Sequence, residues 1–305
     1  MTCAVSRSFR LSVMTAHRLP PARVGDAIAS IARRFARAGL TYGHGTDNPT
    51  DDAAALVFQA GGLSHADAPA AYDVELDLAA RRVLREWVRR RIEERLPSAY
   101  LTGVTWFAGH EMRVDPRVLV PRSPIAELIA ARFEPFIDPT RVQRILDIGT
   151  GSGCIAIACA HAFPAATVDA ADISAAALQV ARDNIAHHGL AGRVQPVLAD
   201  VYDGLPEGRY DIIVSNPPYV PTAVVAALPA EYRHEPALGL DSGPEGLDHV
   251  RRILEGMSAR LAPGGILVVE VGDTDEAVAA AWPQTPFLWL EFEHGGGGVF
   301  LLRMD

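Results

Sequence analysis

The stretch LDIGTGSGC at residues 146–154 decides the fold of this chain. It ends an apolar run at 144–148 and leads directly into a helical pattern at 155–161. Three glycines at alternate positions leave the connecting turn without side chains, so its backbone can approach a ligand closely. The G-x-G-x-G rhythm differs from the G-x-G-x-x-G of a dinucleotide-binding turn. The stretch therefore predicts a strand, a ligand-binding turn and a helix.

The residues around this turn alternate between strand and helix patterns. Strands are predicted at 144–148, 167–172, 194–198, 210–215 and 266–271, and helices at 155–161, 175–188 and 247–261. This alternation is typical of a parallel sheet with helices on both faces. A ligand is then expected at the carboxyl ends of the strands.

Polar residues stand at these strand ends. Asp172 could accept hydrogen bonds from both hydroxyls of a ribose, Asp200 is placed to meet an adenine edge, and Asn216 ends the fourth strand. Each aspartate alone is more typical of a helix cap or a turn. Together with the glycine turn they predict one nucleoside pocket, with the candidate cofactor-binding residues Asp147, Gly149, Thr150, Gly151, Ser152, Gly153, Asp172, Asp200 and Asn216.

The stretch VSNPPYVP at 214–221 ends the strand with Asn216. Pro217 and Pro218 fix the backbone and lack N–H donors, which makes the turn stiff and rich in hydrogen-bond acceptors. Tyr219 could form a wall of the pocket. In isolation the pattern would indicate only a strand terminator with a buried tyrosine.

The first hundred residues follow a helical period. Helices are predicted at 24–38, with Gly39 as their stop, at 51–60 and at 76–96. We predict a helical substrate-recognition domain at 1–100 with a loose N-terminal tail. A hairpin around Gly109 leads through 118–122, so 101–122 is predicted to be a connector and 123–305 the catalytic domain.

Composition excludes several functions. The chain has no lysine, so a Walker phosphate loop, a Schiff base and a lysine general base are excluded. The ten histidines are scattered along the sequence and three cysteines show no ligand spacing, so no metal site is expected. The sequence has no apolar run of membrane-spanning length and no apolar signal core, and we expect a cytoplasmic protein.

Charge is distributed unevenly along the chain, whose net charge is −9. Arginines outnumber acidic residues in 1–100, whereas acidic residues predominate in 101–305. An acidic catalytic domain is a poor binder of duplex DNA and suits a basic protein partner, although such a surface also simply keeps a protein soluble. The arginine-rich segment 81–95 leaves contact with RNA open.

The glycine turn, the acidic strand ends and NPPY resemble the class I S-adenosylmethionine-dependent methyltransferases. The order of helical domain, hairpin and catalytic domain resembles the HemK-like branch, which methylates protein glutamines. Within it, YGHGTDN (42–48), AYLTG (99–103) and VLVPRSPIAELI (118–129) are similar to the enzymes that modify glutamine N5 in the third protein of the large ribosomal subunit. The resemblance covers the chain from about residue 27.

This resemblance implies S-adenosylmethionine as cofactor and a catalytic set of Asn216, Pro217, Pro218 and Tyr219. The Asn216 side-chain oxygen and the Pro217 carbonyl would accept the two amide hydrogens of the substrate glutamine. Both acceptors would gain strength as positive charge develops on the nitrogen. Positioning and exclusion of water would supply most of the rate.

Alternatives remain at this level. The GGQ glutamine of peptide chain release factors is one, but those enzymes usually read P-R-P-E-T-E where this chain has Ser123, Pro124 and Ile125 after Pro-Arg. An amino-methyltransferase acting on nucleic acid and a catalytically silent assembly factor are the others. The segment 222–246 is either a substrate lid or a plain connection, and 42–48 is more typical of a turn than of a substrate contact.

Overall fold

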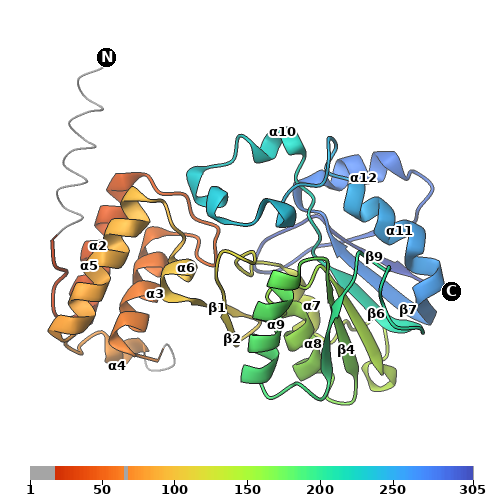
Figure 1. Cartoon of the computed structure of the whole chain (residues 1–305), viewed down its shortest axis with the longest axis horizontal. Helices are drawn as coiled ribbons and strands as arrows, with labels where there is room; N and C mark the ends of the chain where they lie inside the picture. Colours follow the sequence, from red (N-terminus) through yellow and green to blue (C-terminus); the bar gives the residue numbers. More distant parts are fainter. Residues whose placement is uncertain (1–17, 65–67, 305) are drawn as a thin grey trace. The chain divides into compact units, whose positions relative to one another are not determined.

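The computed structural model describes residues 18–64 and 68–304, and the predicted N-terminal tail lies outside these residues. The chain forms two compact units (Figure 1). One contains the residues up to Thr105 together with Pro229–His234, and the other contains Trp106–Leu228 and the residues from Glu235 onward. We call them the helical unit and the catalytic unit.

The helical unit is built from α2 (Val24–Ala38), α3 (Pro49–Gly61), α4 (Ala68–Ala71), α5 (Leu78–Glu93) and α6 (Ser98–Thr102). Helix α2 ends at Gly39, whose left-handed φ of 58° a side chain would disfavour. The Asn48 side chain caps α3 by accepting hydrogen bonds from the backbone N–H groups of Thr50 and Asp51. The 42–48 stretch therefore contains a helix-capping turn, as the sequence favoured.

A segment that follows the NPPY motif in the sequence is part of the helical unit. It is the 3-10 helix η3 (Ala230–His234), which the sequence placed in the catalytic domain. The buried Arg91 guanidinium lies 2.9 Å from an Asp52 oxygen and 3.4 Å from a Glu231 oxygen. Glu231 also accepts a hydrogen bond from the Thr41 backbone. Buried charges are retained only when paired in this way, so Glu231 anchors the segment in the helical unit.

The catalytic unit contains a seven-stranded sheet in the order β5-β4-β3-β6-β7-β9-β8. The five strands that the sequence predicted are present and parallel, and the class I methyltransferase fold is confirmed. The sequence did not predict the two C-terminal strands, β8 and β9. Strand β9 pairs antiparallel with both β7 and β8. The strands are β3 (Arg144–Ile148), β4 (Thr167–Asp172), β5 (Val194–Leu198), β6 (Tyr210–Ser215), β7 (Leu261–Glu270), β8 (Leu288–Leu290) and β9 (Val299–Arg303).

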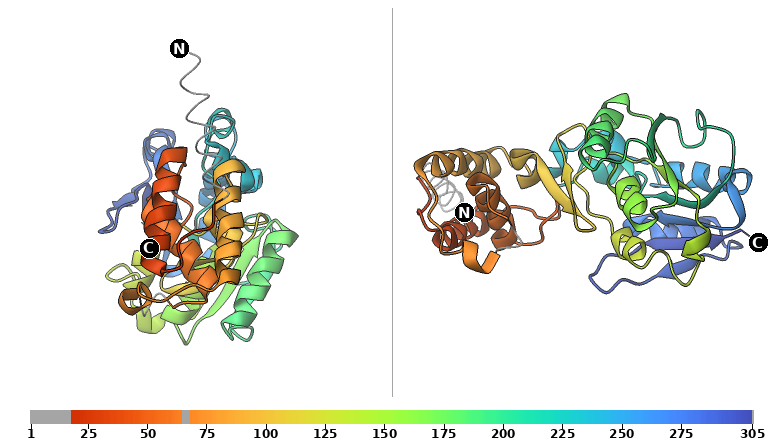
Figure 2. Two further views of the ribbon diagram at one scale, coloured as in Figure 1. Left: turned by 90° about the vertical axis from the view of Figure 1, so that its left-hand side faces the viewer. Right: turned by 90° about the horizontal axis from the view of Figure 1, so that it is seen from below.

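Helices cover both faces of this sheet, as Figure 1 and the further views of Figure 2 show. Alternate residues of β3 and β6 pack into two separate cores: Ile145 and Ile212 face α7, α8 and α9, whereas Leu146 and Ile213 face α11 and α12. The helices are α7 (Ile125–Ala130), α8 (Cys154–Ala162), α9 (Ala175–His187), α10 (Thr222–Val225), α11 (Asp248–Arg260) and α12 (Asp275–Ala281). The remaining 3-10 turns are η2 (Pro139–Arg141), η4 (Ala237–Gly239) and η5 (Gly272–Thr274).

The predicted hairpin is a two-stranded sheet of β1 (Val104–Phe107) and β2 (His110–Arg113). Ala108 and Gly109 both have positive φ, as a tight two-residue hairpin turn requires. The boundary between the two units falls within β1. Within the described part of the chain, we find no helix long and apolar enough to cross a membrane.

Candidate active site

The register of the parallel strands brings the predicted site residues to one edge of the sheet. Ile148, the last residue of β3, pairs with Ala171 of β4 and with Ser215 of β6. The residues that follow these strands, including Gly149 and Asn216, must therefore lie side by side. A Cβ atom on Gly149 would stand 4.0 Å from the Asn216 carbonyl oxygen. The same register adds Glu270, because Ser215 pairs with Val269 of β7.

The glycine turn serves two purposes. Gly151 has a φ of 54°, and a Cβ atom placed on it would meet no heavy atom within 4 Å, so its outer face is open to a ligand. Gly153 has a φ of 83°, and a Cβ there would approach the Ala181 Cβ to 3.3 Å. Gly151 thus permits close approach of a ligand, whereas Gly153 permits α8 to pack against α9.

Asp147 supports this turn from beneath. Its side chain is fully buried, and Oδ2 accepts hydrogen bonds from the Thr150 hydroxyl at 2.6 Å and the Ala156 backbone N–H at 3.1 Å. Among the residues that the structure describes, Oδ1 has no partner. Burial raises the pKa of Asp147 to about 7. These contacts make Asp147 a residue that shapes the turn and the start of α8.

Asp172, at the end of β4, joins the turn to the next helix. Its Oδ2 accepts a hydrogen bond from the Gly151 N–H at 2.9 Å, and its Oδ1 accepts one from the Ser174 N–H at 2.8 Å. Burial raises the pKa of this carboxyl group. Each carboxylate oxygen keeps further acceptor capacity, so Asp172 could also accept ribose hydroxyls.

Two other predicted residues occupy different settings. Ser152 is buried, and its carbonyl accepts a hydrogen bond from the Asn184 side chain at 2.8 Å. Asp200 lies two residues beyond the end of β5, with its side chain 45% exposed and 2.7 Å from the Arg252 guanidinium. The hydrogen bond with Arg252 lowers the pKa of Asp200. Asp200 thus has a cationic partner that the sequence did not reveal.

The NPPY turn presents acceptors that the protein itself leaves unused. Asn216 is half-buried directly after β6. Within the described ranges, neither its side-chain amide nor the Pro217 carbonyl oxygen makes a hydrogen bond to another protein group. Ser215, one residue earlier, is held by its own bond from Oγ to the Ile148 carbonyl at 2.8 Å. The turn is therefore firmly placed while its acceptors stay available.

Tyr219 is fixed by a buried carboxylate that the sequence analysis missed. Its hydroxyl donates to Glu270 Oε1 at 3.2 Å, and the Ser123 hydroxyl donates to Oε2 of the same carboxylate at 2.5 Å. Glu270 is only 5% exposed, and burial raises its pKa to about 7. The Tyr219 ring lies against Gly272, where a Cβ would come within 2.6 Å of it. The one signal in the sequence was an acid at the end of an apolar strand.

The 222–246 segment is ordered by its own contacts. Val220 forms a β-bridge with Asp241, and the Arg122 guanidinium lies 2.5 Å from a Glu235 carboxylate oxygen. Glu235 also accepts a hydrogen bond from the Val120 N–H. These contacts connect the 118–122 stretch to the middle of the segment, within the catalytic unit.

Comparison with known proteins shows what this chain is similar to. Residues 129–228 match the family model of the methyltransferase small domain. The chain is similar to the hMettl16 catalytic domain solved in complex with the MAT2A 3'UTR hairpin 1, with a TM-score of 0.50 and 16% identity over 77% of this chain and 83% of that chain. This likeness shows the fold alone.

Curated relatives are much more similar in sequence. The ribosomal protein uL3 glutamine methyltransferase of Xylella fastidiosa is 47% identical over 91% of this chain and 89% of the relative. The enzymes of the same name from Bordetella pertussis and Neisseria gonorrhoeae are 44% and 45% identical, each over 92% of this chain and 94% of the relative. The chain therefore belongs to the family of the ribosomal protein uL3 glutamine methyltransferases.

Proposed function

We propose that this protein transfers a methyl group from S-adenosylmethionine to the side-chain nitrogen N5 of a glutamine in ribosomal protein uL3. The observation that carries the proposal is the pair of unused acceptors, the Asn216 side-chain oxygen and the Pro217 carbonyl, beside an open glycine turn. The names of its relatives support uL3 as the substrate.

The residues at the sheet edge fit S-adenosylmethionine. The backbone of the Gly149–Gly153 turn would face the cofactor, the Asp172 carboxylate would accept its ribose hydroxyls, and Asp200 lies where an adenine edge is expected. When bound, the cofactor supplies a methyl group activated by its sulfonium. Asp147 would act through the turn, because its carboxylate is fully buried beneath it.

The NPPY residues would help an amide nitrogen, which is a weak nucleophile, to accept the methyl group. The amide lone pair is delocalised into the carbonyl, and the nitrogen becomes nucleophilic only as that delocalisation is lost. Asn216 Oδ1 and the Pro217 carbonyl would accept the two N–H groups and stabilise the positive charge that grows on the nitrogen. One of these protons then leaves to solvent. Tyr219, held by Glu270, would keep water away from the reacting nitrogen.

Ser123 supports the assignment to the uL3 branch rather than to release-factor enzymes. Its hydroxyl donates to the same Glu270 carboxylate that holds Tyr219. A proline at this position, as in the P-R-P-E-T-E pattern, would lack that donor. The departure from the pattern therefore lies within the hydrogen-bond network of the site.

We further infer that the helical unit contributes substrate recognition. The segment that Glu231 anchors in this unit follows the NPPY motif along the chain. The chain therefore runs directly from the proposed methyl-transfer residues into the proposed substrate-recognition unit. Within the arginine-rich helix α5, Arg89 gives little support for contact with ribosomal RNA, because it is paired with Glu86, Glu93 and Glu94. Such pairing leaves less positive charge for phosphates.

The test uses purified protein, labelled S-adenosylmethionine, and unmodified uL3 and release factor as separate substrates. We expect label in uL3 alone, located on one glutamine by mass spectrometry. Asn216→Ala should lower kcat by about 100- to 1000-fold, the usual loss when one preorganised hydrogen-bonding group at the reacting atoms is removed. Cofactor affinity should stay within about threefold. Label in release factor alone would refute the substrate, and unchanged turnover in Asn216→Ala would refute the mechanism.

A further inference from the structure

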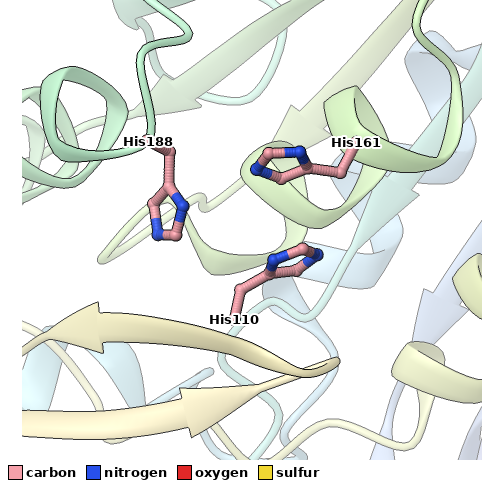
Figure 3. Close-up of side chains that lie close together, drawn as sticks. All are labelled: His110, His161 and His188. Atoms are coloured by element: carbon pink, nitrogen blue, oxygen red, sulfur yellow. The ribbon is translucent and has the colours of Figure 1, made fainter.

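Three histidines from distant parts of the sequence meet in the catalytic unit. His110 begins β2, His161 lies in the last turn of α8, and His188 directly follows α9. One ring nitrogen from each lies within 4.8 Å of the others (Figure 3). These histidines are scattered along the sequence, and their spacing predicted no metal site.

The hydrogen bond of His188 fixes its tautomer. Its Nε2 lies 2.8 Å from the Glu111 carbonyl oxygen. A carbonyl oxygen only accepts, so Nε2 donates this hydrogen bond, and Nδ1 is the nitrogen left to act as a metal ligand. Figure 3 shows that a nitrogen of His188 is turned toward the other two rings. Histidine ligands of metals typically donate their second ring nitrogen to a backbone carbonyl in this way.

The three rings pack closely against one another. The His110 and His161 rings are stacked with centroids 4.3 Å apart, and the His188 ring lies 5.8 and 5.5 Å from them. The packing of the rings therefore gathers three imidazole nitrogens at one place.

Backbone charge favours a cation at the same place. The helices α8 and α9 both end at the cluster, and the C-terminal end of a helix carries partial negative charge. Two charged groups lie nearby: the Arg193 guanidinium, bonded to the Ala160 carbonyl at 2.7 Å, and the Glu111 carboxylate, 3.9 Å from His187. The two side chains carry opposite charges.

We propose that His110, His161 and His188 together bind one divalent transition-metal ion of the class that prefers imidazole, such as Zn²⁺. Three nitrogens and one water molecule would complete a tetrahedral site, in which ligand nitrogens stand about 3.4 Å apart for Zn–N bonds of about 2.0–2.1 Å. The nitrogens now lie within 4.8 Å of one another, so rotations of the side chains would have to bring them to this distance.

The site is separate from the methyl-transfer chemistry. Helix α8 begins at the glycine turn and ends at the cluster, and its nine residues span about 14 Å. The metal would join β2 to α8 and α9. The buried Asn184 side chain already makes a similar link, since it donates to the carbonyls of Arg113 and Ser152. The ion would thus stabilise the packing of the β1–β2 hairpin against α8 and α9.

The test measures Co²⁺ and Zn²⁺ binding to untagged, chelator-treated protein by equilibrium dialysis and by the visible absorption of Co²⁺. We expect one ion per chain, with Zn²⁺ displacing Co²⁺. The variants His110→Ala, His161→Ala and His188→Ala should each weaken binding by at least the 10- to 100-fold that loss of an outer partner costs. His294→Ala, which removes a histidine away from the cluster, is the matched control and should bind as wild type does.

Thermal unfolding gives a second measurement. Zn²⁺ should raise the Tm of wild type and of His294→Ala but not that of His161→Ala, whose exposed side chain can be removed without loss of folding. Less than one bound ion per chain at saturation, or undiminished binding in the three cluster variants, would overturn the proposal. Neither readout depends on methyl transfer, so failure here leaves the proposed function untouched.

Discussion

Glu270 should give the stability of this protein a pH dependence that one substitution removes. The carboxyl group is 5% exposed, and burial raises its pKa from 4.5 to about 7. The folded protein therefore holds this proton more tightly than the unfolded chain does. The stabilisation is fully present below about pH 4.5 and is lost as the pH rises through 7.

The magnitude follows from the shift. The shift in the pKa of Glu270 corresponds to about 3 kcal/mol of unfolding free energy. This contribution is lost at about 1.4 kcal/mol per pH unit between the pKa of the unfolded chain and that of the folded protein. Glu270→Gln keeps the shape of the side chain and the acceptor for one hydroxyl but does not titrate. Relative to this variant, wild type should therefore lose about 3 kcal/mol of unfolding free energy between pH 4.5 and 8.

The assay is urea unfolding of both proteins, followed by circular dichroism at half-unit steps of pH. Taking the difference between the two proteins cancels other titrating groups, among them Asp147. Glu276→Gln removes an exposed carboxylate from α12, and its difference from wild type should stay nearly flat. Parallel curves for wild type and Glu270→Gln across this range would show that Glu270 does not hold a proton in the folded protein.

Two further substitutions test the packing that positions the site. Gly153→Ala should destabilise the protein by about 1–3 kcal/mol and weaken cofactor binding, because its Cβ would stand 3.3 Å from that of Ala181 at a positive φ. Calorimetry measures both the stability and the cofactor affinity, and Gly192→Ala is the control. Equal Tm values for Gly153→Ala and wild type would contradict the reasoning. Arg91→Met should cost about 3–5 kcal/mol, because the buried Asp52 carboxylate loses its cationic partner and Glu231 keeps, among the described residues, only Arg95, at 3.5 Å. A loss below about 1 kcal/mol in urea unfolding would contradict this reasoning.

The sequence by itself determined the elements of the catalytic unit and the main parts of its site. The glycine turn at 149–153 and the Asn216 strand end were predicted where they occur, because period, turn chemistry and strand ends are local properties of a chain. Parallel strands align their carboxyl ends, so predicting the elements also placed Asp172 and Asn216 at one edge.

Only the tertiary structure decided which distant residues act together. Glu270 looked like an ordinary strand end until the register of β7 set it beside Asn216 and under Tyr219. Glu231 lies in the helical unit, where its carboxylate pairs with the buried Arg91 guanidinium. His110, His161 and His188 met because one strand and two helices end at the same place. Contacts of this kind depend on how elements pack, and no local pattern in a single sequence encodes them.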